Sequence, residues 1–175
     1  YVPEGCPEWL SAAKIHDARL AIISRWNRLP GLSDDNVLDG NFLRNWFERC
    51  FELLSQVHCF DYGIQQLGRV LASSPEGSDG MWPVEDVRDI IEKYGCDALK
   101  KGLVTGHISL YGPTVKGTYE GGDSERELMH EYRAYAQQMN VHWPKTVTVL
   151  TSLADVYQRI AVTCDRDAEE RADQG

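Results

Sequence analysis

The sequence lacks an excess of positive charge. Its 175 residues include 18 lysines and arginines against 27 aspartates and glutamates, which gives a formal net charge of −9. Only part of this charge lies in the acidic last segment, 165–175, so the body of the chain is acidic as well. Proteins that bind nucleic acid usually gather lysine and arginine in a patch or stripe that meets the phosphate backbone. We therefore expect that nucleic acid is not the principal ligand of this chain.

Sequence signatures of dedicated catalytic and cofactor sites are also missing. The chain has no G-x-S-x-G, G-x-x-x-x-G-K-[ST] or G-x-G-x-x-G segment, and its five histidines form no H-x-x-x-H or H-E-x-x-H pair. Glu127 and His130 match only half of a di-iron motif, which needs a second Glu-x-x-His pair and two further glutamates. We therefore predict no cofactor and no bound metal, and no residue stands out as catalytic.

The cysteines form no recognisable framework. They are five in number, scattered, and include no C-x-x-C pair. This usage is typical of a reduced protein, and Cys50 falls in an apolar helical pattern, where a thiol behaves as a small hydrophobic group. No apolar run approaches the roughly 18 residues that a membrane span requires. We predict a cytoplasmic protein without a membrane span.

What the sequence does have is helical periodicity. Apolar residues recur at three- and four-residue spacing along almost the whole chain, which places them on one face of each helix. The pattern predicts a compact all-α domain of about seven helices, the last of about 20 residues. The first six are expected over 8–28, 43–57, 60–73, 82–94, 97–103 and 124–139, and the last begins at Trp143-Pro144.

Proline, glycine and serine give the expected boundaries. Pro83 and Pro144 suit the first position of a helix, where an amide hydrogen has no partner to lose. Ser124, with Glu127 three residues later, has the spacing of a capping box, so a helix should begin there. The turn-rich loop 74–80 separates an N-terminal half, 1–74, from a C-terminal half, 81–164, which pack as one domain and precede a charged tail, 165–175.

Tryptophan is abundant, with five residues in the chain. Trp46 lies on the richest apolar stripe, so we expect it to be buried in the core. Trp82 and Trp143 precede prolines and are expected to pack at helix entries. Buried tryptophans fill core space, whereas exposed ones favour a partner interface.

The stretch 105–122 departs from the helical pattern. It holds five glycines and a proline among β-branched and aromatic residues. Either a short hairpin that turns at Gly112-Pro113 or an ordered loop would fit this composition. Tyrosine and arginine are frequent in interfaces, and a long loop in a small domain is often functional. The candidate interaction residues are His107, Tyr111, Lys116, Tyr119 and the nearby Arg126. In the alternative interpretation, the tyrosines lock this loop onto the helices as core.

Four segments in the second half follow a recognisable order. They are WPVEDVRDIIE, LKKGLVTGHIS, GGDSERELMHEYRAYA and WPKTVTVLTSLADVYQRIA. Together they resemble a helical module at the C-terminal end of long uncharacterised bacterial proteins. The first half, with DARLAIISRW and DGNFLRNW, is similar more loosely. The resemblance implies a domain appended to a large cytoplasmic bacterial protein, and it carries over no catalytic or binding residue.

These observations favour a non-catalytic interaction or regulatory module at the C-terminus of such a protein. The chain begins at Tyr1 rather than at a methionine, so we expect it to be part of a longer polypeptide. Its partner would then be the rest of the parent chain or another protein, with no nucleic acid and no membrane. The alternative is a small enzyme or ligand-binding domain with its site on the 105–122 loop, and a third hypothesis is a metal-binding helical bundle.

Overall fold

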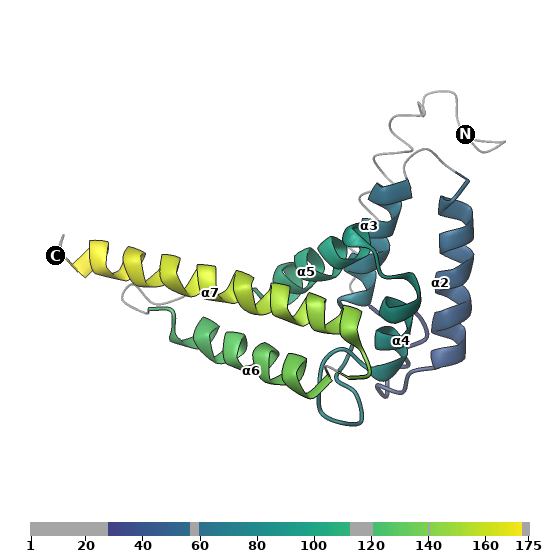
Figure 1. Ribbon diagram of the computed structural model, residues 1–175, viewed down its shortest axis with the longest axis horizontal. Coiled ribbons are helices and arrows are strands. Elements are labelled where there is room, and N and C mark those ends of the chain that lie inside the picture. The colour runs from purple at the N-terminus through teal and green to yellow at the C-terminus, as the bar shows by residue number, and fades with distance from the viewer. Residues whose placement is uncertain (1–27, 57–59, 113–120, 140, 173–175) are drawn as a thin grey trace.

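The computed structural model describes residues 28–56, 60–112, 121–139 and 141–172 (Figure 1). Over these ranges the protein is all-α, as predicted, with six helices and no strand. The helices are α2 (Gly40–Leu54), α3 (Phe60–Leu71), α4 (Glu85–Tyr94), α5 (Asp97–Tyr111), α6 (Asp123–Met139) and α7 (Pro144–Ala172). The helix expected over 8–28 lies outside the described residues, apart from Arg28.

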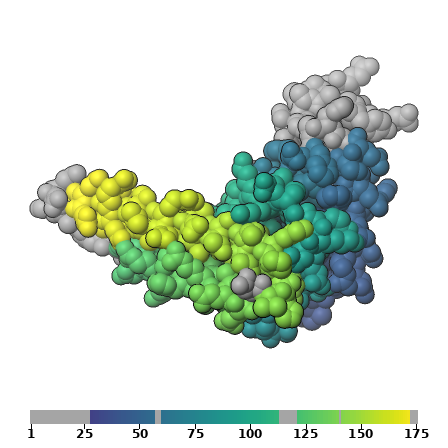
Figure 2. Space-filling view, viewed as in Figure 1, coloured from purple at the N-terminus to yellow at the C-terminus, as the bar shows by residue number. Residues whose placement is uncertain are grey.

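The helices form two groups. α6 packs along α7, and this pair projects as an arm from α2, α3, α4 and α5, which gather at the other end (Figure 1). In the space-filling view the arm narrows toward the C-terminal end of α7 (Figure 2). α3 packs against α5, and α4 joins the two groups through contacts with α7 and α2.

The buried apolar side chains form one cluster that runs through both groups. Leu43, Phe47, Ile91, Leu103 and Leu150 are among its most completely buried members. Because the same cluster includes residues of the arm and of the other helices, the two groups share a core. The division into the halves 1–74 and 81–164 stays a prediction.

The structure corrects the expected loop at 105–122. Residues 105–111 are the last turns of α5, which is 15 residues long rather than ending at residue 103. Gly106, part of the expected loop, and Gly102, inside the predicted helix, are both contact points, since a Cβ at either would collide with the backbone of α3. Gly68 on α3 faces this contact in turn. The tight crossing of two helices therefore outweighs the low helix propensity of glycine. Residues 113–120, which include the proposed turn, lie outside the described residues.

α7 is 29 residues long, against the expected length of about 20. It continues into the charged segment 165–175 as far as Ala172. Asp165 holds it, because this carboxylate accepts the amide hydrogen of Gly122 at 2.7 Å and pairs with the guanidinium of Arg126. The contact also accounts for the start of α6 at Asp123, so that Ser124 lies inside the first turn and not at the cap.

The two Trp-Pro pairs behave differently. Pro144 is the first residue of α7, as predicted. Pro83 follows a cis peptide bond and precedes α4 by two residues, so it is not the first residue of that helix. The first amides of α7 find their acceptor on α4, where the Glu92 carboxylate accepts from Lys145 at 3.1 Å and from Thr146 at 2.8 Å. A carboxylate at the start of a helix is favourable because it also meets the positive end of the helix dipole.

Trp46 does not lie in the core. It is partly buried, whereas Leu43 and Phe47 are the buried residues of α2. The apolar stripe of α2 is wider than the face that packs on α3 and α4, so one edge of it remains accessible. Trp82, which was expected to pack at a helix entry, is buried, with 5% of its surface exposed, and Trp143 is partly buried.

Candidate functional site

A buried arginine holds the connection between α3 and α4. The Arg88 side chain is 0% exposed and donates to both carboxylate oxygens of Asp79, at 2.6 and 2.8 Å. It also donates to the carbonyl oxygens of Met81, at 2.5 Å, and Pro83, at 2.6 Å, while its guanidinium carbon lies 4.9 Å from the ring centre of Trp143. The hydrogen bonds from Arg88 lower the pKa of Asp79. A buried charge with this many partners fixes the loop that supplies them.

Two serines complete the anchoring of this loop. Glu85, at the start of α4, accepts the amide hydrogen of Ser78 at 2.9 Å and its hydroxyl hydrogen at 2.6 Å. These bonds from Ser78 are the main reason why the pKa of Glu85 is lowered. Ser74 accepts the amide hydrogen of Val84 at 2.9 Å. The middle of the loop 74–84 is therefore tied to α4, and its two ends are bonded to each other.

Next to this loop lies an aromatic cluster of five residues from the loop and from α5, α6 and α7. It is centred on His107, whose ring centre lies within 4.7 to 6.2 Å of each of the other four. The members are Trp82, His107, Tyr111, Tyr132 and Tyr157. Three of the contacts are edge-to-face, which is a favourable arrangement of aromatic rings.

His107 is neutral at physiological pH. Its side chain is 3% exposed, and this burial lowers its pKa to about 4. The ring nitrogens lie 2.8 Å from the hydroxyl oxygen of Tyr132 and 3.4 Å from that of Tyr157. A neutral imidazole has one donor and one acceptor, so it can satisfy one hydroxyl in each role. Burial raises the pKa of Tyr157 to about 12 and raises that of Tyr132 further, so both tyrosines keep their protons.

An open groove of about 910 Å³ lies over the aromatic cluster, between the loop 74–84 and α6. Hereafter it is called the acidic groove. Four carboxylates line it, and no lysine or arginine does so within the described part of the chain. The carboxylates are those of Glu76, Glu85, Asp86 and Glu131, and the aromatic residues that line it are Trp82, His107, Tyr111 and Tyr132.

The four carboxylates differ in their partners. Asp86 pairs with Arg44, and Glu85 accepts the bonds from the loop. Glu131 accepts only the hydroxyl hydrogen of Tyr135, at 2.5 Å, and neither it nor Glu76 pairs with a cation among the described residues. Burial raises the pKa of Tyr135, and the charges of Glu131 and Glu76 raise it further, so both carboxylates act on this one hydroxyl.

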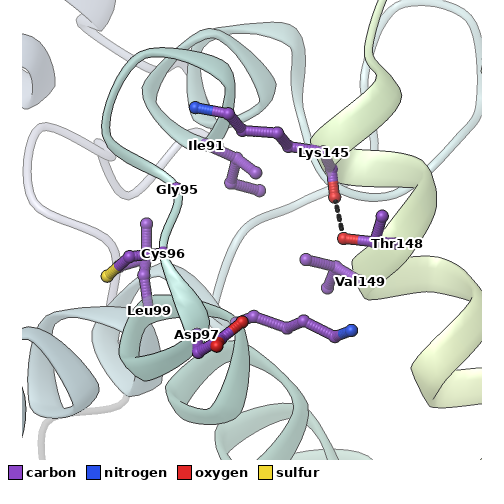
Figure 3. Close-up of a pocket in the computed structure, with 9 residues that line it drawn as sticks. Ile91, Gly95, Cys96, Asp97, Leu99, Lys145, Thr148 and Val149 are labelled. Atoms are coloured by element: carbon purple, nitrogen blue, oxygen red, sulfur yellow. Dashed lines mark hydrogen bonds between the residues drawn. The ribbon is translucent and has the colours of Figure 1, made fainter.

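Two other hollows have a different character. A groove of about 380 Å³ between α5 and α7 is lined by both signs of charge, with Lys100, Lys101 and Arg159 facing Asp97 and Asp155. A smaller pocket of about 200 Å³ lies where α4, α5 and α7 meet (Figure 3).

In the smaller pocket the side chains of Thr148 and Lys145 already have partners within the protein. The Thr148 hydroxyl donates to the carbonyl oxygen of Lys145 at 2.7 Å (Figure 3). The ammonium of Lys145 donates to the carbonyl oxygen of Glu92 at 2.6 Å. Figure 3 shows the sulfur of Cys96 directed away from Thr148 and Val149. The arrangement presents no group of side chains aimed at a common ligand.

The residues singled out from the sequence do not form one site. His107 and Tyr111 line the acidic groove from α5, and Tyr111 is 54% exposed. Arg126 lies on α6, where it pairs with Asp123 at 2.7 Å and with Asp165 instead of lining the groove. Lys116 and Tyr119 lie outside the described residues.

Sequence reasoning missed the residues that build the groove around His107 and Tyr111. Arg88 was the available signal, because it shares a helix face with Val84, Val87 and Ile91. A charged residue on an apolar face must find partners inside the protein. Glu76 and Glu131 carry no such signal, since isolated acidic residues in a turn and on a helix are usually solvated.

The described residues contain no group of three or more histidine, cysteine, aspartate or glutamate side chains that could hold a metal ion. Glu127 and His130 are both exposed. Among the described helices, none has the combined length and apolar character needed to cross a membrane.

Comparison with family models, with curated proteins and with solved structures finds no match for this chain. The resemblance to the bacterial C-terminal module therefore stays a prediction.

Proposed function

We propose that this domain is a non-catalytic interaction module that binds an extended polypeptide segment in the acidic groove. The observation that carries the proposal is the groove itself, in which Glu76 and Glu131, unpaired with any cation of the described residues, lie beside aromatic side chains. Tyr111 contributes a half-exposed ring at the edge of an otherwise buried cluster. Interfaces are enriched in such residues, which combine a large contact area with a hydrogen-bonding group.

The chemistry of the groove favours binding over catalysis. His107 is the natural candidate for a general base, but both of its ring nitrogens face tyrosine hydroxyls and its pKa is about 4. The Ser78 hydroxyl donates to Glu85, whose lowered pKa makes it a poor acceptor of that proton at neutral pH. The same carboxylate holds the Ser78 amide, which is a structural task.

In this proposal the module is the C-terminal domain of a larger cytoplasmic bacterial protein. The segment that it binds comes from the parent chain or from another protein. Cys50, Cys96 and Cys164 carry free thiols, which is compatible with a reducing compartment.

A second candidate is a small ligand in the same groove. Its volume of about 910 Å³ lies within the range of roughly 300–1,000 Å³ that is common for small-molecule sites. This candidate corresponds to the alternative of a ligand-binding domain with its site at 105–122. His107 and Tyr111 belong both to that segment and to the lining of the groove.

Peptide display on the purified 175-residue chain tests the proposal. Peptides selected on the wild-type chain are expected to lose binding to Glu131→Lys and to keep it with Glu127→Lys. Both variants change the charge of α6 equally, but only Glu131 lines the groove. Circular dichroism establishes that both variants remain folded. Failure to select any peptide, or equal binding of the peptides to both variants, would overturn the proposal.

A further inference from the structure

We infer that the acidic groove recognises a cationic side chain, the ammonium of lysine or the guanidinium of arginine, in the polypeptide segment that it binds. The inference rests on the proposed function and names what that function selects. In this inference Glu76 and Glu131 bind the charged end of the lysine or arginine, and Tyr111 packs against the aliphatic part of that side chain.

Charge complementarity is the first argument. The lining of the groove contains four carboxylates and no basic residue within the described part of the chain. Arg44 neutralises Asp86 from outside the lining, and Glu85 is engaged by Ser78. Among the described residues, only Glu76 and Glu131 of the four then have neither an ion pair nor a bond to the loop, and they come from different elements. Such a site attracts a positive group and rejects an acidic segment, because like charges across an interface are costly.

The aromatic lining is the second argument. A lysine or arginine side chain has a long apolar stem and a charged end, and it buries the stem while the end stays in a polar environment. Tyr111 offers an accessible ring for this contact beside the acidic residues, and cations are attracted to aromatic faces. A small apolar ligand would use the rings and leave the carboxylates without a role.

Rigidity is the third argument. The loop that carries Glu76 is held at Asp79 by Arg88 and at Ser78 by Glu85. Glu131 lies in the third turn of α6, a regular helix packed along α7. Because the backbone that carries both residues is fixed, a bound cation has to order only their side chains, which limits the loss of affinity that ordering causes.

The groove between α5 and α7 is the internal comparison. It carries three basic and two acidic side chains, so its charges largely cancel. If only the net negative charge of the protein attracted the cation, the cation would bind at many places on the surface. The different charges of the two grooves predict instead that it binds at the acidic groove alone.

The test uses capped nine-residue Gly-Ser peptides that carry two lysines, two arginines, two acetyl-lysines or two glutamates. Affinities for the 175-residue chain are measured by nuclear magnetic resonance titration at constant ionic strength. The lysine and arginine peptides are expected to bind at least fivefold more tightly than the acetyl-lysine and glutamate peptides. Equal affinity for the lysine and acetyl-lysine peptides would overturn the inference.

A matched pair of variants locates the effect. Glu76→Gln with Glu131→Gln should weaken binding of the lysine peptide at least fivefold, and the glutamine can still accept the hydroxyl hydrogen of Tyr135. Glu127→Gln with Glu169→Gln removes the same charge outside the groove and should change the affinity by less than twofold. Equal weakening by both pairs would mean that general acidity attracts the peptide, and would overturn the inference.

The result separates this inference from the proposed function. If peptides chosen by display occupy the groove but contain no lysine or arginine, the module stands and the cation preference is wrong. If no peptide of any composition binds, both are wrong. Free butylammonium ion, titrated in parallel, should bind far more weakly than the lysine peptide, and equal affinity would contradict a polypeptide as the ligand.

Discussion

Asp79 and Glu76 lie three residues apart in one loop, yet their carboxylates have opposite surroundings. Asp79 accepts two hydrogen bonds from Arg88, which is 0% exposed. Glu76 borders the acidic groove and pairs with no described cation. The first charge is paired with a fully buried guanidinium and holds the loop. The second has no structural task in the described protein, and such a charge beside aromatic residues is where a ligand can gain binding energy.

The largest loss of stability is expected when Arg88, the partner of Asp79, is replaced. Arg88→Met removes the partner of Asp79 and the donors to the Met81 and Pro83 carbonyls, which should lower the free energy of unfolding by about 3–5 kcal/mol. Chemical denaturation measures this loss. The control is Arg44→Met, which breaks the more exposed pair with Asp86 and should cost no more than about 1 kcal/mol. Equal losses would mean that burial does not distinguish the two pairs.

The second effect is a dependence of stability on pH. The pKa of His107 is about 4 in the folded protein, against 6.5 for an unperturbed histidine. Between these values the unfolded chain takes up a proton that the folded chain does not, so stability falls as the pH falls through this window. At about 1.4 kcal/mol for each pKa unit, the loss is about 3 kcal/mol.

His107→Gln isolates this contribution, because glutamine does not titrate. Denaturation at pH 6.5 and at pH 4 should give a smaller difference for the variant than for the wild type. The same difference in both proteins would contradict a buried neutral His107.

A third, smaller effect sharpens the distinction between glycines in loops and glycines at contacts. Gly102→Ala places a Cβ against the backbone of Gln65, which should cost about 1–3 kcal/mol because the two helices must move apart. Lys101→Ala, at the exposed neighbouring position, should remain within about 0.5 kcal/mol of the wild type. A neutral or stabilising Gly102→Ala in thermal unfolding would show that the helices are not in close contact.

The smallest effect on stability is expected at the groove. Glu76→Gln and Glu131→Gln should each change the free energy of unfolding by no more than about 0.5 kcal/mol, because neither carboxylate has an ionic partner among the described residues. Chemical denaturation of the single variants checks this. A loss comparable to that of Arg88→Met would make these residues structural and remove the contrast within the loop.

The sequence predicts those parts of the fold that depend on local pattern. Periodic apolar residues identified α2, α3 and α6, and Pro144 marked the start of α7 correctly. The predicted end of α5 was wrong because Gly106 suggests a loop until α3 is in place beside it. The missing information is a contact between distant segments, which a local pattern does not contain.

The site was harder to predict for the same reason. His107 and Tyr111 were singled out, but as parts of a loop with Lys116 and Tyr119. Their neighbours in the groove come from the 74–84 loop and from α6, and only the folded chain brings these together. Arg126, chosen for its chemistry, is engaged by acidic side chains elsewhere.

The central claim is that the acidic groove, and not the general acidity of the surface, receives the cationic segment. A map of amide chemical shifts during titration with the arginine peptide tests it directly. We expect the largest changes at Gly77, Ser78, Tyr111 and Glu131, with little change at Lys101 and Asp155 in the mixed-charge groove. Changes spread evenly over the acidic surface, or concentrated between α5 and α7, would contradict the account.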